Sequence, residues 1–238
     1  MSFSPVIETR ALSKVFGPQR ALDGVNLQVA PGAIGLLGPN GAGKSTFIKC
    51  LLQLQPITSG SAKLLGREVG REGREIRKRL GYTPEQDCHI PGMAGCEYVT
   101  YCAQLCGLPF QAARQRAHEM LDFVGMGQER YRKADTYSTG MKQRLKLAQA
   151  IVHDPEIVFL DEPTNGLDPK GQATTAMIPF VLKPIEKCRQ RAFAFMAAFL
   201  PDGHSESTTC LSHATVANRS SPLPDRMIPC CEAWRGAA

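Results

Sequence analysis

The segment from Gly38 to Ser45 constrains the fold of this 238-residue chain more than any other feature. It reads Gly-Pro-Asn-Gly-Ala-Gly-Lys-Ser and satisfies the pattern G-x-x-x-x-G-K-[ST]. A short apolar run, Ile34 to Leu37, precedes it, and a predicted helix from Ser45 to Leu54 follows and is stopped by Pro56. Glycines let the backbone curl so that successive N–H groups point inward, and the helix adds the positive end of its dipole. The segment therefore predicts a strand, a phosphate-binding loop and a helix.

The loop residues have distinct predicted roles in binding a nucleoside triphosphate. Lys44 is placed to contact the β- and γ-phosphates as a point charge, the Ser45 hydroxyl suits Mg²⁺, and Thr46 supports the same loop. The alternative, a chance glycine-rich turn, is disfavoured because the flanking strand and helix are both predicted. A guanine-reading N-K-x-D element is absent from the sequence, which argues against a GTPase. The predicted nucleotide-binding residues are Gly38, Pro39, Asn40, Gly41, Ala42, Gly43, Lys44, Ser45 and Thr46.

Two adjacent carboxylates follow a second apolar run. Ile157 to Leu160 lies between Asp154-Pro155 and the pair Asp161-Glu162, so it is interpreted as a buried parallel strand. Asp161 is placed to hold Mg²⁺, and Glu162 is placed to face the γ-phosphate and to orient or deprotonate the attacking water. Read alone, the pair also fits a helix N-cap. Together with the phosphate loop it indicates a hydrolytic site.

The remaining signals predict an α/β protein with two additions. Val6 to Arg10 and Val25 to Val29 indicate an N-terminal antiparallel β element, and Leu80 to Tyr82 indicates a further strand. Nearly all signals between residues 93 and 153 are helical, which predicts a helical subdomain inserted between strands of a sheet flanked by helices. The charged residues of 67–79 have helical spacing and are interpreted as a solvated helix face rather than as a nucleic-acid or lipid patch.

Composition excludes several classes of protein. The net charge of +6 and the hydrophobic fraction of 43% are ordinary for a soluble globular chain, and no apolar run approaches the roughly 18 to 20 residues of a membrane-spanning helix. The N-terminus lacks the features of a signal peptide, so we expect a cytoplasmic protein. Nine cysteines without a C-x-x-C pair argue against a disulfide framework. The group at 88–106 fits no zinc spacing, and Cys102 with Cys106 also fits a buried helix face.

A resemblance to the ATP-binding cassette family rests on two segments. Tyr137-Ser-Thr-Gly-Met-Lys-Gln-Arg is followed by a helix to His153-Asp-Pro, and then by Ile157-Val-Phe-Leu-Asp-Glu-Pro-Thr-Asn-Gly-Leu-Asp168-Pro. The resemblance covers about residues 6 to 170. The sequence Tyr-Ser-Thr-Gly-Met in particular is similar to that of ATPase subunits of ABC-2 type exporters, including antibiotic and multidrug efflux systems. It implies that Ser138 and Gly140 cap the γ-phosphate of ATP held by a second subunit. The usual L-S-G-G-Q is altered here by Tyr137, Thr139 and Met141.

The resemblance also assigns roles to four further positions. Phe16 falls where the family stacks an aromatic ring on adenine, whereas the residue alone also fits a core phenylalanine. Gly81 to Gln86 resembles the Q-loop, with Glu85 at the glutamine position and Gln86 one step later, so either residue is a candidate metal contact. Asp168 matches the D-loop aspartate, which implies a contact with the opposite subunit.

The C-terminal part departs from the family. A switch histidine is expected about 30 residues after the D-loop, and Ala198 falls at its position, whereas His204 and His213 come later and fit surface histidines. Residues 171–238 contain four cysteines and six prolines and show no sustained period. We therefore predict a cassette over residues 1–170 and a degenerate or divergent segment over 171–238. A frame change or strong decay is the hypothesis for that segment, and the coding DNA would decide it.

These features together predict an ATP-binding and ATP-hydrolysing subunit that powers a membrane exporter through nucleotide-driven dimerisation. The expected cofactors are ATP and Mg²⁺. The expected partners are a second copy or a paired cassette subunit, and a separate transmembrane permease that holds the protein at the inner face of the cell membrane. One alternative is a truncated or frame-shifted remnant that binds ATP without productive turnover or transport. A soluble cassette acting on ribosomes or DNA is a third interpretation, but such proteins tend to carry two cassettes or long coiled-coil insertions, so no nucleic acid is expected.

Overall fold

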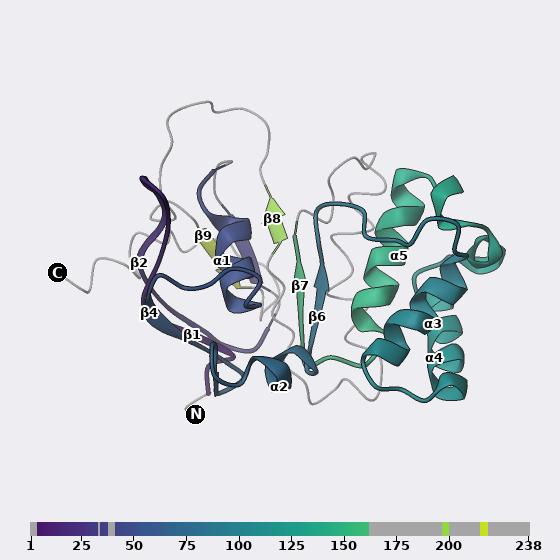
Figure 1. Ribbon diagram of the computed structural model, residues 1–238, viewed down its shortest axis with the longest axis horizontal. Coiled ribbons are helices and arrows are strands. Elements are labelled where there is room, and N and C mark those ends of the chain that lie inside the picture. The colour runs from purple at the N-terminus through teal and green to yellow at the C-terminus, as the bar shows by residue number, and fades with distance from the viewer. Residues whose placement is uncertain (1–3, 33, 38–40, 162–196, 200–214, 219–238) are drawn as a thin grey trace. The chain divides into compact units, whose positions relative to one another are not determined.

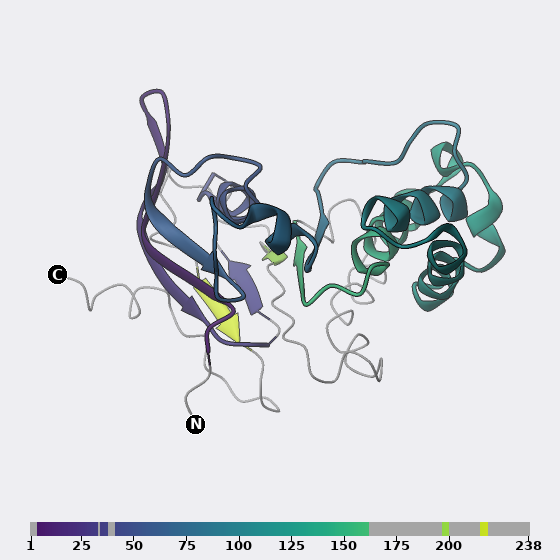
Figure 2. The same cartoon turned by 60° about the horizontal axis from the view of Figure 1, so that its bottom comes forward.

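The computed structural model describes residues 4–32, 34–37, 41–161, 197–199 and 215–218. The chain divides into two compact units, one formed by residues 1–77 with 191–238 and the other by residues 78–190 (Figures 1 and 2). The predictions for Glu162, Asp168, His204, His213 and the boundary at residue 170 lie outside the described residues.

An antiparallel sheet dominates the first unit. Its strands run in the order β2-β1-β4-β5. Both predicted N-terminal strands are confirmed, and both extend further than the sequence signals because pairing continues past irregularities in β1 up to a turn at Gly17-Pro18. Ala11 lies at one such irregularity and has a positive φ of 46°. The strands are β1 (Ile7–Phe16), β2 (Gln19–Val29), β4 (Ser59–Leu64) and β5 (Arg67–Glu68).

The predicted strand and helix around the phosphate loop are also confirmed. β3 (Ile34–Leu37) pairs in parallel with β8 (Ala197–Phe199) and antiparallel with β9 (Thr215–Asn218). α1 (Lys44–Leu51) contacts β2 and β4 and buries Phe47, Ile48 and Leu51. The helix ends three residues before the predicted Leu54, because Gln53 takes a left-handed conformation, with φ of 59°, that an α-helix does not accommodate.

The charged segment 67–79 is not one helix. Arg67 lies in β5, and only α2 (Gly73–Arg77) is helical. Arg67 pairs with Glu72 at 2.6 Å and Arg71 with Glu68 at 3.4 Å, so local ion pairs hold the intervening turn. The prediction of a solvated helix face over this segment was therefore wrong, because its first two residues form strand β5, which pairs with β4 at the edge of the sheet.

A parallel strand pair forms the sheet of the second unit, as predicted. β6 (Leu80–Thr83) pairs with β7 (Ile157–Leu160), and all four residues of β7 are buried. At the amino ends of the strands, the Arg79 guanidinium donates two hydrogen bonds of 2.6 Å to the Glu156 carboxylate. This bidentate pair fixes the register of two segments that lie 77 residues apart.

The helices of the second unit that the structure describes lie between β6 and β7 in sequence. α5 packs against β6 and also contacts α3 and α4 (Figures 1 and 2). Gly81 permits this approach, because a Cβ at Gly81 would collide with the Ala150 carbonyl oxygen. None of the helices in the described ranges is both long and apolar enough to cross a membrane. The elements are α3 (Gly95–Leu105), α4 (Phe110–Phe123), η1 (Gly127–Tyr131), η2 (Ala134–Thr136) and α5 (Thr139–Ile151).

His153 links the loop after α5 to β6. Its Nε2 lies 2.9 Å from the Leu80 carbonyl oxygen and donates to it, while the buried Nδ1 has no partner within the described part of the chain. Burial lowers the pKa of His153, which the hydrogen bond to Leu80 only partly opposes. The neutral imidazole is therefore the form that suits the fold.

We expect His153 to make stability depend on pH. Its contribution is fully present above the unfolded-state pKa of about 6.5 and is lost as the pH falls from there through the lower folded-state pKa. Urea unfolding followed by circular dichroism at several pH values measures this. His153→Gln keeps a donor for Leu80 but cannot titrate, so the difference from wild type should shrink with falling pH; a pH-independent difference would contradict the assignment.

Candidate functional site

The described part of the phosphate loop runs from Gly41 to the first turn of α1. Gly43 is the N-cap of α1 and has a left-handed conformation with φ of 86°, and no side chain caps the helix. Lys44 begins the helix and is only 6% exposed, and the first turn contains no acidic residue. A helix N-terminus of this kind presents backbone N–H groups to an anion. Gly38, Pro39 and Asn40 lie outside the described residues.

Phe16 closes β1 and is 42% exposed. The interpretation of Phe16 as a core phenylalanine is therefore wrong. The Lys14 ammonium lies 4.6 Å from the centroid of the ring, and it also donates a 2.8 Å hydrogen bond to the Pro56 carbonyl oxygen. The cation anchors the end of β1 to the segment after α1, while the ring stays accessible for stacking.

Asp161 follows β7 directly and is only 2% exposed. Its backbone N–H donates to the Thr83 carbonyl oxygen at 3.1 Å, and the Tyr82 hydroxyl donates to its Oδ2 at 3.3 Å. Burial raises the pKa of Tyr82, and the negative charge of Asp161 raises it further, so the phenol stays a donor. No local sequence signal marks Tyr82 for this role except its place in the strand beside β7.

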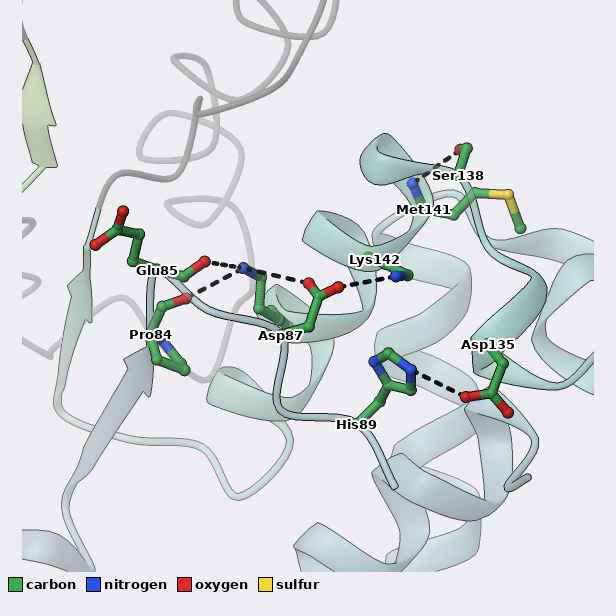
Figure 3. A network of polar contacts seen from close by, with 9 residues as sticks. Pro84, Glu85, Asp87, His89, Asp135, Ser138, Met141 and Lys142 are labelled. Carbon is green, nitrogen blue, oxygen red and sulfur yellow. Dashed lines mark hydrogen bonds and ion pairs between the residues drawn. The ribbon is translucent and has the colours of Figure 1, made fainter. Parts of the chain in front are cut away.

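Hydrogen bonds to main-chain oxygens hold the Q-loop segment against α5. The Lys146 ammonium on α5 donates to the carbonyl oxygens of Pro84 at 3.1 Å and Glu85 at 2.9 Å. Glu85 and Gln86 are exposed, and Figure 3 shows the Glu85 carboxylate turned away from α5. Either side chain is therefore available to an external ligand.

The segment with the altered signature begins α5. Ser138 is the N-cap, and its Oγ accepts the Met141 N–H at 3.3 Å (Figure 3). Tyr137 is buried before it and donates from its hydroxyl to the Glu129 carbonyl oxygen at 2.8 Å. Gly140 lies in the first turn of the helix, which contains no acidic residue. This helix N-terminus is thus also suited to an anion.

Two carboxylates tie the loop before α3 to its surroundings. The Asp87 Oδ2 accepts a 2.8 Å hydrogen bond from the Lys142 ammonium, which holds the pKa of Asp87 below its ordinary value. Asp135 accepts the Gly92 N–H at 2.6 Å and lies 3.3 Å from His89 Nε2 (Figure 3), and the backbone hydrogen bond is the main cause of its lowered pKa. Sequence reasoning missed Asp87, Lys142 and Lys146, although the two lysines are spaced by one helical turn.

The cysteines between residues 88 and 106 are free thiols. Cys102 is partly buried, which raises its pKa to about 11, whereas Cys106 is exposed. The interpretation of both as a buried helix face was therefore wrong for Cys106. Across the described ranges, no group of three or more histidine, cysteine, aspartate or glutamate side chains is arranged to hold a metal ion.

The fold and these segments define an α/β nucleotide-binding ATPase domain with an inserted helical subdomain. The family model described as ABC transporter matches residues 22–165, and the chain belongs to this family. In the ATP-binding cassette MJ0796, solved as a dimer in a post-hydrolysis state bound to ADP and Pi, 88% of the chain superposes on 82% of this one, with a TM-score of 0.71 and 23% identity. That likeness supports the fold.

Curated relatives are closer in sequence. The daunorubicin/doxorubicin resistance ATP-binding protein DrrA of Streptomyces peucetius is 42% identical over 167 residues, which is 70% of this chain and 51% of that protein. The bacitracin transport ATP-binding protein BcrA of Bacillus licheniformis is 39% identical over 169 residues, 71% of this chain and 54% of that protein. The chain thus spans about half the length of the curated relatives it matches.

We expect the Ser138 cap to contribute measurably to folding. Ser138→Ala should lower the free energy of unfolding by about 0.5–2 kcal/mol, because the Met141 N–H loses its acceptor. Ser138→Asn supplies another capping oxygen and should recover most of that loss. Urea unfolding of the three proteins measures the effect, and equal stabilities of the alanine and asparagine variants would refute the capping role.

Proposed function

We propose that the chain is the ATP-binding and ATP-hydrolysing subunit of a membrane exporter and that nucleotide-driven dimerisation powers transport. The observation that carries the proposal is the start of α1, where the glycine N-cap, the absence of side-chain capping and the buried Lys44 favour a phosphate ligand. Membership in the ABC transporter family supports ATP as that ligand. The names of DrrA and BcrA, one a drug-resistance and the other a transport protein, support export.

The proposed nucleotide site combines groups from four stretches of sequence. Residues Gly38 to Thr46 cradle the phosphates, with Lys44 on the β- and γ-phosphate oxygens, and Phe16 stacks on the adenine ring. Mg²⁺ prefers oxygen ligands, which the Ser45 hydroxyl and the Asp161 carboxylate supply, with Glu85 or Gln86 as a further contact. An ion held there would neutralise charge on the phosphates. Glu162 orients or deprotonates the attacking water.

A second subunit completes the proposed site. Ser138 and Gly140, at the N-terminus of α5, would cap the γ-phosphate of ATP held by the partner, because this helix end offers N–H groups and no acidic residue in its first turn. Asp168 would contact the opposite subunit. The dimer is thus a pair of these chains, or this chain with a paired cassette.

The proposed setting is cytoplasmic, at the inner face of the cell membrane through a separate permease. The proposed division of the chain is a cassette over residues 1–170, with its helical subdomain at about 93–153, and a degenerate or divergent segment over 171–238. No nucleic-acid partner is proposed.

One observation favours a remnant that binds ATP without turnover. Ala198 lies in β8, which pairs in parallel with β3, the strand before the phosphate loop. The resemblance implies a switch histidine at this position, and an alanine side chain has no group that could donate a hydrogen bond to the γ-phosphate. A steady-state phosphate-release assay distinguishes this candidate from an active ATPase.

Lys44→Ala should weaken ATP binding. Loss of a charge-assisted hydrogen bond is worth about 1.5–3 kcal/mol, which corresponds to roughly a 10- to 100-fold rise in Kd. Calorimetry with magnesium ATP measures it. Lys49→Ala, in the last turn of the same helix, is the matched control and should bind like wild type. Unchanged affinity of the Lys44 variant would remove the basis of the proposed site.

Glu162→Gln should bind ATP and accumulate as a closed dimer. Removing a general base typically costs about 10²- to 10⁴-fold in rate, so phosphate release should fall by that factor while affinity is retained. Size-exclusion chromatography with ATP reports the dimer. Glu119→Gln on the surface of α4 is the control. Rapid turnover by the Glu162 variant would contradict its assigned role.

A further inference from the structure

Two lysines of α5 contact the Q-loop segment, here residues 84–87, from the same side. Lys142 and Lys146 lie one helical turn apart, and both ammonium groups contact residues 84–87, which come about 60 residues earlier in the chain. Figure 3 shows the contact of Lys142 with Asp87. Ser138, the N-cap, precedes Lys142 by one more turn, and the Lys142 N–H donates to the Ser138 carbonyl oxygen at 2.9 Å. Residues spaced by four lie on one face of a helix. The face that starts at Ser138 therefore carries both cations.

Lys146 is the inner member of this pair. Only 4% of the residue is exposed, although a lysine ordinarily keeps its ammonium in water. Its two hydrogen bonds go to main-chain carbonyl oxygens, and Asp87 Oδ1 lies 4.0 Å away. A buried ammonium is costly unless it has such partners. These contacts therefore account for the burial of the cation, and they hold the backbone of Pro84 and Glu85 against the helix.

Asp87 joins the two lysines. Its Oδ2 accepts from Lys142 at 2.8 Å, while its Oδ1 faces Lys146. The Lys142 side chain is more exposed than that of Lys146, so water and salt weaken the outer pair while the inner contacts are shielded. Asp87, Lys142 and Lys146 together form a clasp, in which the contacts of Lys146 are the better shielded from solvent.

We propose that Lys146 is a positioning residue for ATP hydrolysis, which ties the Q-loop backbone to the helix of the altered signature so that the two segments move together. The inference rests on the proposed function. Lys146 bonds to main-chain oxygens while the side chains of Glu85 and Gln86 are exposed, so the clasp fixes the stretch of backbone from which those side chains would reach a ligand. In this proposal, Lys146 itself contacts neither the nucleotide nor the attacking water.

The test compares Lys146→Met with wild type in the full chain. Methionine has a similar length but no charge, so the two carbonyl oxygens lose their donor. We expect kcat for ATP to fall about tenfold, the equivalent of one lost hydrogen bond, while KM changes less than about twofold. Hydrogen–deuterium exchange should rise in the amides of residues 85–88. A purely structural role would instead lower stability throughout the second unit without separating kcat from KM.

Two further variants calibrate the result. Lys142→Met removes only the outer pair and should lower kcat by no more than about threefold, as expected for a partly exposed ion pair. Lys133→Met, an exposed lysine of the same unit outside the clasp, is the matched control and should behave like wild type. If Lys146→Met does not fold, Lys146→Gln replaces it, because its shorter, uncharged amide cannot hold both carbonyl oxygens as the ammonium does, and exchange at 85–88 should still rise.

The outcomes separate the two proposals. Unchanged kcat and unchanged exchange in the Lys146 variant would overturn the clasp while leaving the proposed function intact. A wild-type chain that binds ATP without releasing phosphate would overturn the proposed function and, with it, the role of Lys146 in hydrolysis. In that event, exchange at residues 85–88 still decides whether Lys146 holds the Q-loop backbone.

Discussion

The parallel pairing of β6 with β7 is the constraint on which the arrangement of the second unit depends. In a parallel pair both strands end at the same edge, so the residues that follow Thr83 and Leu160 must emerge together. Asp161 follows one strand and the Q-loop segment follows the other. The Arg79–Glu156 ion pair fixes the opposite ends, and a slip of one residue would move Asp161 out of reach of Tyr82. Strand register, set at one end, thereby determines the side-chain geometry at the other.

Buried cations are a second common element of the two units. Lys14, Lys44 and Lys146 are each less than one tenth exposed, and none lies in an apolar environment without compensation. Lys14 and Lys146 donate to main-chain carbonyl oxygens and so fasten a loop to a neighbouring element. Lys44 lies at a helix N-terminus, where a cation is electrostatically unfavourable unless an anion shares the place. The same side chain thus serves as a structural tie at two positions, and the third lies at the helix N-terminus proposed to bind phosphate.

The sequence predicted those features that are encoded by adjacent residues. The strand before the phosphate loop, the helix after it and the buried run of β7 all follow from local patterns, and the structure confirms them. The Tyr82–Asp161 and Lys146–Glu85 contacts join residues 79 and 61 positions apart, and no local pattern specifies such pairs. Lys146 was overlooked for a further reason: a lysine in an amphipathic helix is normally assigned to the solvent face. The prediction of a helix face over residues 67–79 was wrong because helical spacing of charges does not distinguish a helix from a strand and a turn held by ion pairs.

The altered signature shows how a substitution can preserve the position of its neighbour. Tyr137, in place of the usual leucine, is buried, and its hydroxyl finds an acceptor in the Glu129 carbonyl oxygen. Gly95 at the start of α3 makes room for the ring, since a Cβ there would collide with the tyrosine hydroxyl. Burial raises the pKa of Tyr137, so it remains a donor and the hydrogen bond is not lost to ionisation at neutral pH. Because Tyr137 is fixed on both sides, the next residue is held where it can cap α5. The packing of Tyr137 therefore helps to set the geometry of Ser138.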